Sequence, residues 1–490
     1  MRLSELARGL GLNVPPGSDP EVTGVEHDSR QARPGDLFVA LPGQRFDGRA
    51  FAAAAVAAGA VAVLGPEPGP EQGEIAVDVP WLVVDDPRAL LGPLAARVYG
   101  HPDRELILAG VTGTNGKSTV ATLMAAILDA AGHPAGFIGT LGYRFRDKSY
   151  AGGHTTPEAS DLFRILREMR ADGAAAAAME VSSHALAMGR VGGARFDAAV
   201  FTNLTRDHLD YHKDFEDYFA AKRKLFDLLK PGRRPAFNVD DPYGRQLAAE
   251  IPDALTFGER GEVSAREAVL TTVGIRGVLT TPRGEVPFTT PLLGRYNLSN
   301  LLAAAAAAET LELPLEAVAA AFAAQRPVPG RLEPVDRGQP FAVFIDYAHT
   351  DAALDAALRS AREVVGGGKV AVVFGCGGDR DSGKRPMMGK VAGELADLVI
   401  ATSDNPRSED PHAILAAIEE GLKASGNRGY RLVPDRRQAI REAIDAAQPG
   451  WAVLVAGKGH ETYQILGDRK LPFSDLEEIG KALEERRWPG

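Results

Sequence analysis

A glycine-rich segment ending in Lys-Ser-Thr at 117–119 carries residue types that can hold phosphate groups. Glycines let backbone N–H groups close around phosphate oxygens, Lys117 can reach the terminal phosphates, and the Ser118 hydroxyl can hold a Mg²⁺ ion. The segment departs from the strict motif, because Val111 stands five residues before the second glycine of the loop. The residue types nevertheless predict a nucleotide-binding loop.

The residues on either side predict the strand and helix that such a loop requires. The apolar run 106–109 leads into the turn, and apolar side chains recur at helical spacing from Val120 to Leu128. Gly132 can end that helix. A glycine-rich turn alone is more often structural, but the strand, the Lys-Ser pair and the amphipathic helix together indicate nucleotide binding.

Three further polar residues are candidates for phosphate or metal chemistry. Glu180 ends an alanine-rich run, interpreted as a buried strand, and could be a metal-binding carboxylate or a plain cap or salt bridge. His208 is bracketed by Asp207 and Asp210, so a ligand role stays open beside the structural role usual for a lone histidine. Lys222 lies in an amphipathic helix, where a solvated surface lysine is the simpler interpretation.

The last third of the chain contains four apolar runs, each followed by a polar loop. In open parallel α/β sheets ligands bind beyond the carboxyl ends of the strands, so we expect all four loops at one edge. Arg380 and Arg407 lie in these loops, where a guanidinium can grip a carboxylate or form a surface salt bridge. Asn297 and Asn300, near the start of a predicted helix, could cap it or bind a base. The four runs are 341–345, 370–374, 398–401 and 452–456.

Composition restricts the class of protein. The formal net charge of -10 argues against a general nucleic-acid binder. The single cysteine, Cys376, permits no internal disulfide and suits a reducing compartment. The N-terminus lacks the apolar core of a signal peptide, and the longest apolar stretch, 51–64, is too short to cross a bilayer. We expect a cytoplasmic monomer with small-molecule substrates, without nucleic acid and without membrane insertion.

The length of 490 residues is too great for one core and predicts about three domains. Residues 1–98 contain short strands and turns that fit a small α/β domain. Residues 99–328 alternate strand-like and helical runs, as a mostly parallel sheet requires, with antiparallel pieces near 260–290. Two prolines and a glycine within 327–331 predict a linker. Residues 329–490 are expected to form a Rossmann-like, doubly wound α/β domain.

Taken in order, these motifs resemble those of the Mur ligases, the ATP-dependent amino-acid-adding enzymes of bacterial cell-wall synthesis. The resemblance runs essentially from end to end and includes the three-domain order. Asp404-Asn-Pro-Arg407 resembles the signature of the branch that adds meso-2,6-diaminopimelate; lysine-adding relatives differ there. The other motifs are Gly113-Thr-Asn-Gly-Lys-Ser-Thr119, Glu180-Val-Ser-Ser-His184, Asn203-Leu-Thr-Arg-Asp-His-Leu-Asp210, Gly294 with Asn297 and Asn300, Gly330-Arg331, and Asp346-Tyr-Ala-His349.

The resemblance implies how the central part of the chain uses ATP. Lys222 matches the family lysine that CO₂ converts to a carbamate, N6-carboxylysine, and only motif alignment separates it from Lys224. The implied catalytic residues are Lys117, Glu180, His208 and Lys222, and the implied Mg²⁺ ligands are Ser118, Glu180, His208 and modified Lys222. The implied ATP contacts are Gly113, Thr114, Asn115, Gly116, Lys117, Ser118, Thr119, Asn297, Asn300, Arg331 and Asp346.

The resemblance also implies the binding sites of the two other substrates. Arg407 would clamp the distal carboxylate of diaminopimelate and Glu461 would accept from its ammonium, so that lysine would leave a buried Arg407 unpaired. His154 departs from a usual asparagine, and Asp351-Ala-Ala353 follows Thr350 where a proline is typical. The UDP-substrate residues are Ser29, Thr155, Thr156, Ser182 and Arg190; the diaminopimelate residues are Arg380, Asp404, Asn405, Pro406, Arg407, Gly457 and Glu461.

The implied activity is that of an ADP-forming ligase of peptidoglycan precursor synthesis. ATP would phosphorylate the D-Glu γ-carboxylate of UDP-N-acetylmuramoyl-L-Ala-D-Glu, and the amine of meso-diaminopimelate would attack the acyl phosphate. An L-lysine-adding ligase and a folylpolyglutamate synthetase are alternatives within the class, against which the Asp404–Arg407 segment and the first domain argue. A nucleotide-binding regulator or motor ATPase without ligase activity is the alternative from another class.

Overall fold

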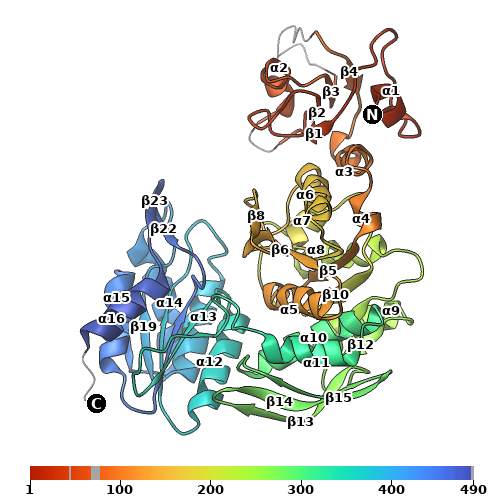
Figure 1. Ribbon diagram of the computed structural model, residues 1–490. Coiled ribbons are helices and arrows are strands. Elements are labelled where there is room, and N and C mark those ends of the chain that lie inside the picture. The colour runs from red at the N-terminus through yellow and green to blue at the C-terminus, as the bar shows by residue number, and fades with distance from the viewer. Residues whose placement is uncertain (44–45, 68–77, 487–490) are drawn as a thin grey trace. The chain divides into compact units, whose positions relative to one another are not determined.

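The structure is a computed structural model that describes residues 1–43, 46–67 and 78–486 (Figure 1). The chain divides into two compact units, both built from helices and mostly parallel strands, which confirms the expected α/β fold class. Among the described residues, no helix combines the length and apolar character needed to cross a bilayer. Unit 1 comprises Met1–Thr112, Gly132–Ala199 and Ala221–Pro235; unit 2 comprises Gly113–Ala131, Val200–Ala220 and Ala236–Gly490.

Unit 1 begins with a small parallel sheet. Its strands β1 (Gly24–Glu26), β2 (Asp36–Val39), β3 (Ala62–Gly65) and β4 (Trp81–Val83) pair in chain order. The helices around it are α1 (Leu3–Ala7), η1 (Gly48–Phe51), α2 (Ala52–Ala57) and α3 (Pro87–Val98). The apolar stretch 51–64 supplies α2 and most of β3, as a buried helix followed by a strand predicts. Phe38, Ala52 and Val63 form part of one buried core there.

Unit 1 also holds a second group of strands, which are neighbours in the order β5, β9, β6, β7, β8. The first three are parallel, and β7 and β8 are antiparallel to their neighbours. The strands are β5 (Ile107–Thr112), β6 (Ala135–Gly139), β7 (Gly142–Phe145), β8 (Lys148–Tyr150) and β9 (Ala176–Glu180), and the helices are α4 (Pro102–Glu105), α6 (Ala159–Ala171), α7 (Ser183–Ala187) and η3 (Phe226–Leu228).

The alanine run before Glu180 is the strand β9, as expected, although alanine favours helices. All five residues of β9 are buried, and both edges of the strand are hydrogen-bonded, to β5 on one side and to β6 on the other. Pairing on both edges and burial on both faces outweigh a helix propensity that is small per residue. Glu180, the last residue of β9, therefore lies where the carboxyl ends of these parallel strands meet.

Unit 2 contains the helix that follows the phosphate loop. Helix α5 (Lys117–Ala130) starts directly after the loop and packs against α10, whose alanine run 303–308 is buried. The region near 260–290 is the expected antiparallel sheet, β13 (Ser264–Thr271), β14 (Gly274–Thr281) and β15 (Gly284–Thr290). Other elements of this part are β11 (Ala236–Asn238), α9 (Pro242–Glu250), β12 (Leu255–Phe257), α10 (Arg295–Thr310) and α11 (Leu315–Ala324). Two elements, β10 (Ala198–Phe201) and α8 (Phe215–Arg223), are divided between the two units.

The end of unit 2 is the doubly wound sheet that the four apolar runs predict. The strand order is β16-β17-β21-β18-β19-β20, and only β16 runs antiparallel. No helix or strand is assigned between α11 and β16, where the linker was expected. The strands are β16 (Glu333–Pro334), β17 (Ala342–Asp346), β18 (Val370–Phe374), β19 (Leu398–Ala401), β20 (Tyr430–Leu432) and β21 (Ala452–Ala456).

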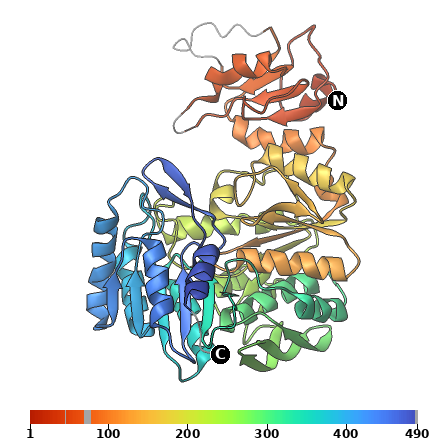
Figure 2. The same ribbon diagram turned by 60° about the vertical axis from the view of Figure 1, so that its left-hand side comes forward.

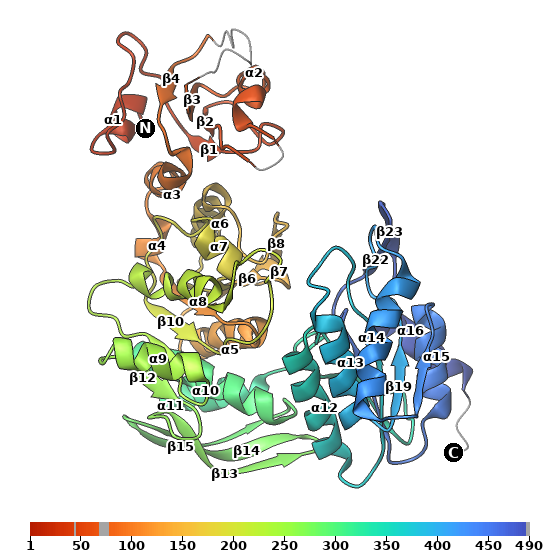
Figure 3. The ribbon, with the colours of Figure 1, turned by 180° about the vertical axis from the view of Figure 1, so that it is seen from behind.

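Helices cover both faces of this six-stranded sheet. Figure 3 shows α12 (Asp351–Val365), α13 (Lys384–Leu395) and α14 (Pro411–Ser425) on one side, and α15 (Arg436–Ala446) and α16 (Asp475–Glu485) on the other. The hairpin of β22 (Tyr463–Leu466) and β23 (Arg469–Pro472) stands clear of the sheet (Figure 2, blue). Because the central strands are parallel, the loops after β17, β18, β19 and β21 share one edge.

A buried ion pair ties α15 to α16. Arg436 and Asp475 are both inaccessible to solvent, and two N–H groups of Arg436 donate to the carboxylate at 2.8 and 2.7 Å. A third hydrogen bond, from Arg436 Nη2 to the Ala456 carbonyl, joins the pair to the end of β21. The pair therefore connects two helices with the strand that leads into the last polar loop.

We predict that Asp475→Asn lowers the free energy of unfolding by about 3–5 kcal/mol, because it leaves the Arg436 charge buried without its partner. The matched control is Glu485→Gln, which breaks the exposed Arg441–Glu485 pair between the same helices and is expected to cost under about 1 kcal/mol. Urea unfolding measures both values. Equal losses in the two variants would contradict the prediction.

Candidate active site

Two glycines shape the phosphate loop. Gly113 has φ 151° and Gly116 has φ 91°. A Cβ atom on Gly113 would lie 1.9 Å from Thr202 Oγ1, and one on Gly116 would lie 2.4 Å from Asn300 Oδ1. The loop thus requires glycine at 113 and 116, whereas Val111 is a buried residue of β5, which explains the departure from the strict motif.

Hydrogen bonds join the loop to the polar segment that follows β10. The Thr202 hydroxyl donates to the Asn115 carbonyl at 2.6 Å, and the Asn115 N–H donates to Asn203 Oδ1 at 2.9 Å. The Thr205 N–H donates to Thr114 Oγ1 at 3.0 Å. Lys117 Nζ folds back over the loop and donates to the carbonyls of 113 and 114 at 2.9 and 2.8 Å. These contacts fix the loop in a shape that presents backbone N–H groups at the start of α5.

Asn297 and Asn300 lie inside α10 and are buried, so the interpretation of these residues as helix caps is wrong. Asn297 Nδ2 donates to the Leu293 carbonyl at 2.8 Å, and Asn300 Nδ2 donates to Asn297 Oδ1 at 2.9 Å. The Asn300 carbonyl oxygen is thereby directed at Gly116 of the phosphate loop. A contact of these amides with a base stays a prediction.

Arg331 contacts the same loop, and the backbone of the next residue, Leu332, binds Asp346 at the end of β17. Arg331 Nη2 donates to Ser118 Oγ at 3.1 Å, and its guanidinium carbon lies 4.7 Å from the centre of the Tyr347 ring. Asp346 is buried and accepts from the Leu332 N–H at 2.7 Å and from the Tyr296 hydroxyl at 3.1 Å. Burial raises the pKa of Asp346. Unit 2 therefore gathers the phosphate loop, both asparagines, Arg331 and Asp346.

Asp207 lies between His208 and His349, a histidine to which we assigned no role from the sequence. Its Oδ2 lies 3.4 Å from His208 Nε2 and 3.5 Å from His349 Nε2. Burial opposes ionisation of Asp207, but His349, His208 and Lys384 outweigh burial and hold the pKa of this carboxyl well below its usual range. The carboxylate is thus a fixed negative charge between the two imidazoles. His208 itself has φ 55°, an uncommon backbone conformation for histidine.

Lys222, at the end of α8, is nearly completely buried at 1% exposure, whereas Lys224 is exposed. The interpretation of Lys222 as a solvated surface lysine is therefore wrong. Glu180 is also buried, and its two oxygens accept from the Thr140 N–H at 2.8 Å and the Thr140 hydroxyl at 3.2 Å. Gly139 permits this approach, since a Cβ there would lie 2.3 Å from Glu180 Oε1.

The residues expected to hold the UDP-substrate lie mostly together in unit 1. Thr156 Oγ1 donates to the Glu180 carbonyl at 2.9 Å and accepts from the Ser182 N–H at 3.0 Å. Arg190 reaches the Thr156 carbonyl at 3.4 Å. Thr155 Oγ1 lies 3.1 Å from Thr140 Oγ1. Ser29 follows β1, and among the described residues it forms no hydrogen bond with the other four.

The loops expected to hold diaminopimelate meet beyond the ends of β18, β19 and β21. Asn405 Nδ2 donates to Glu461 Oε2 at 3.1 Å, and a Cβ on Gly457 would lie 3.1 Å from Asp404 Oδ2. Arg407 has φ 51°, and its backbone pairs with Leu466 of the hairpin. Pro406 is buried beside these loops, and Arg380 is exposed. Arg407 and Arg380 both lie near Gly377: a Cβ atom added to this glycine would lie 2.9 Å from Arg407 Nη1 and 3.8 Å from Arg380 Cγ.

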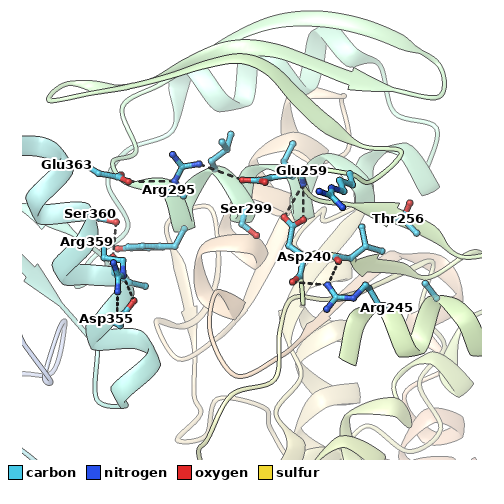
Figure 4. Close-up of a pocket in the computed structure, with 17 residues that line it drawn as sticks. Asp240, Arg245, Thr256, Glu259, Arg295, Ser299, Asp355, Arg359, Ser360 and Glu363 are labelled. Atoms are coloured by element: carbon cyan, nitrogen blue, oxygen red, sulfur yellow. Dashed lines mark hydrogen bonds and ion pairs between the residues drawn. The ribbon is translucent and has the colours of Figure 1, made fainter. Parts of the chain in front are cut away.

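A cavity of about 1070 Å³ lies between α9, the end of β12, α10 and α12. Figure 4 shows that its charged side chains face one another: Arg359 pairs with Asp355, and Arg295 lies between Glu259 and Glu363. None of the predicted site residues lines it. It opens on a different face of α10 from Asn297 and Asn300 and is therefore distinct from the phosphate loop.

Comparisons with known proteins agree along the whole chain. Family models match in three segments: "Mur ligase family, catalytic domain" over 21–99, "Mur ligase middle domain" over 111–308, and "Mur ligase, glutamate ligase domain" over 330–459. A relative from Geobacter metallireducens is 45% identical over 99% of both chains. The chain belongs to the Mur ligase family.

Other similar proteins extend this result. The Geobacter relative carries the name UDP-N-acetylmuramoyl-L-alanyl-D-glutamate--2,6-diaminopimelate ligase, as does one from Gloeobacter violaceus that is 45% identical over 100% of this chain and 99% of its own. A solved structure with that name is 34% identical, covers 95% of both chains and has a TM-score of 0.66. MurF from Acinetobacter baumannii, 21% identical, shares the fold with a TM-score of 0.70, covering 99% of this chain and 98% of its own.

Two residues of this Mur ligase site were missed by sequence reasoning. Thr140 fixes Glu180, and His349 flanks Asp207. Thr140 directly follows the buried strand β6, so the rule that polar residues at strand ends carry function could have found it. His349 lies in a quoted motif, but only the fold brings it to Asp207.

We predict that Gly116→Ala weakens ATP binding by about tenfold or more, because the added methyl group meets Asn300 and distorts the phosphate loop. The control is Gly132→Ala, which imposes the same left-handed strain at φ 86° but meets no atom within 4 Å. Isothermal titration calorimetry measures the dissociation constants. Equal affinities in the two variants would refute the role assigned to this close approach.

Proposed function

We propose that this Mur ligase adds meso-2,6-diaminopimelate to the D-Glu γ-carboxylate of UDP-N-acetylmuramoyl-L-Ala-D-Glu, coupled to the conversion of ATP to ADP and phosphate. The observation that carries the proposal is 45% identity over essentially the full length to ligases with that name. The Asp404-Asn-Pro-Arg407 loop supports it, because it lies at the ligand-binding edge of a doubly wound sheet. The product would serve peptidoglycan precursor synthesis in the cytoplasm.

The first step transfers the γ-phosphoryl group of ATP to the substrate carboxylate. The backbone N–H groups of the phosphate loop, Lys117 and Arg331 would stabilise the charge on the phosphate oxygens during transfer. Asn297, Asn300 and Asp346 would hold the nucleoside end. Arg331 already contacts Ser118, so a single guanidinium links the loop with the residues before β17.

Mg²⁺, when bound, would neutralise the phosphate charge. Ser118, Glu180, His208 and a carbamate on Lys222 would hold it, and three of these four supply the oxygen ligands that Mg²⁺ prefers. The burial of Glu180 and Lys222 fits this role. A carbamate on Lys222 would add an anionic oxygen ligand to the hydroxyl of Ser118 and the carboxylate of Glu180.

The second step is attack of the diaminopimelate amine on the acyl phosphate, which releases phosphate and forms the amide. No side-chain nucleophile is required. Burial raises the pKa of the Cys376 thiol to about 12, which removes it as a nucleophile at neutral pH. Arg407 would bind the distal carboxylate and Glu461 the distal ammonium. The UDP-substrate would lie on Thr155, Thr156, Ser182, Arg190 and Ser29.

Several further features belong to the same proposal. The domains would be 1–98 for the UDP-substrate, 99–328 for ATP and 329–490 for the amino acid, in a monomer without nucleic-acid partners.

A folylpolyglutamate synthase from Mycobacterium tuberculosis is 19% identical and covers 74% of this chain, a likeness of fold alone. An L-lysine-adding ligase would have no use for Arg407 as a carboxylate clamp.

The deciding experiment is phosphate release by purified protein with ATP, Mg²⁺ and UDP-N-acetylmuramoyl-L-Ala-D-Glu. Release is expected only when meso-diaminopimelate is added. Turnover with L-lysine in its place would retain the ligase and reject the assigned specificity. Turnover without any acceptor would favour a regulator or motor ATPase and overturn the proposed function.

A second prediction concerns Lys222. Lys222→Arg is expected to lower the turnover number at least about 100-fold, because arginine cannot form the anionic carbamate. Lys224→Arg, two residues away on the exposed side, should keep full activity. With isotopically labelled bicarbonate, a carbamate resonance should be seen by NMR in the native protein and in Lys224→Arg and be absent from Lys222→Arg. A resonance that survives in Lys222→Arg would reject the assignment.

A further inference from the structure

A second buried lysine lies under the acceptor loops. Lys458 follows Gly457 at the end of β21, and its side chain is 0% exposed. A lysine ammonium is rarely buried without partners, because removal of a charge from water is costly. Nζ lies 2.9 Å from Glu461 Oε2, 3.4 Å from Asn405 Oδ1 and 3.8 Å from Asp404 Oδ1. Lys458 thus contacts three residues expected to hold the acceptor.

One lysine reaches a loop that is not its immediate neighbour in the sheet. Strand β18 lies between β21 and β19, and the contacts of Lys458 with Asn405 and Asp404 show that the loops after β21 and β19 meet beyond the end of β18. Gly457 adopts φ 114° and brings no side chain between the loops. Lys458 therefore lies in the seam where the two loops meet.

The contacts of Lys458 leave one oxygen of Glu461 uncommitted. Oε2 accepts from Lys458 Nζ and from Asn405 Nδ2. In the described part of the chain, Oε1 has no hydrogen-bond partner. Asn405 is fixed as well, since its Oδ1 accepts from the Ile465 N–H at 2.9 Å and its Nδ2 faces Glu461. The orientation of Glu461 thus depends directly on Lys458.

Lys458 also sets the charge of the pocket. Among the side chains there that are not exposed, Asp404 and Glu461 contribute two negative charges, and Lys458 and Arg407 contribute two positive charges; the exposed Arg380 lies beside the exposed Asp379. The Tyr463 ring centre lies 5.5 Å from Lys458 Nζ, and Arg407 Nη1 donates to the Asn405 carbonyl at 3.4 Å, so these charged groups meet at the same loop ends. The nearby Arg436 is already neutralised by Asp475. A pocket of zero net charge suits a ligand end that carries both a carboxylate and an ammonium.

We propose that Lys458 is a positioning and specificity-determining residue for the acceptor. It fixes Glu461 so that Oε1 meets the distal ammonium of diaminopimelate, and it cancels the charge that would otherwise favour a ligand end with a lone ammonium, such as that of L-lysine. The inference rests on the proposed function. It assigns to Lys458 a role in the choice of acceptor that is separate from any role in phosphoryl transfer.

The test compares Lys458→Met with Lys458→Gln, Lys458→Arg and the exposed control Lys423→Met, which breaks a surface pair with Glu419. Steady-state kcat and KM are measured for meso-diaminopimelate and L-lysine at saturating ATP and UDP-substrate. Both neutral variants should raise KM for diaminopimelate about tenfold or more, with a smaller change in kcat. The ratio of kcat/KM for diaminopimelate over L-lysine should fall by a similar factor, because the pocket gains a net negative charge.

Lys458→Arg keeps the charge and should retain most of that ratio, and Lys423→Met should match the native protein. The glutamine variant keeps a donor for Glu461, so it tests the charge even if the methionine variant fails to fold. Equal loss with both acceptors, leaving the ratio unchanged, would overturn the inference while native diaminopimelate-dependent turnover upholds the proposed function. Native protein without such turnover would instead reject the proposed function.

Discussion

The close approach of polar side chains to glycines in loops beyond the carboxyl ends of strands is the constraint on which both parts of the unit 2 site depend. Gly116 meets Asn300 of α10, and Gly457 meets Asp404 of another loop, at distances that leave no room for a Cβ atom or barely admit one. A parallel sheet places such loops at one edge, where they must pack on neighbouring elements as well as on a ligand. Glycine at these points lets polar side chains from a neighbouring helix or loop come close.

Three charged side chains of unit 2 are buried and have charged or polar partners. Asp207 lies between two imidazoles, Arg436 is held by Asp475, and Lys458 lies among a glutamate, an aspartate and an asparagine. In a medium of low dielectric constant each pair is stiff, because the loss of one partner leaves a costly lone charge. The protein thus holds its ligand-binding groups in fixed orientations before any ligand arrives.

The pattern of apolar runs predicted most of the fold. The four runs of the last third are β17, β18, β19 and β21, and the alanine run before Glu180 is β9. These predictions were possible because a short apolar run bounded by polar loops indicates a buried strand. The same rule located the phosphate loop and the arginines of the last domain. Resemblance to a family supplied roles that spacing alone left open, including those of Asn297 and Asn300.

Buried polar residues escaped this kind of analysis. Lys222 looked like a surface lysine and Asn297 like a helix cap, yet both are 1% exposed. A lysine or an asparagine can be buried when residues distant in sequence supply its hydrogen-bond or ionic partners. The periodicity of one segment does not identify those distant residues. For Lys458 the partner residues come from two loops more than fifty positions apart.

The isolation of Cys376 gives this protein a practical advantage. Its thiol lies in the core next to Met388, is 2% exposed and resists ionisation. Maleimides and other reagents that require an accessible thiolate will therefore leave the folded chain unmodified. A cysteine introduced at an exposed position, such as Val273 in the turn between β13 and β14, would carry a fluorophore or spin label alone, and the native sequence would need no background substitution.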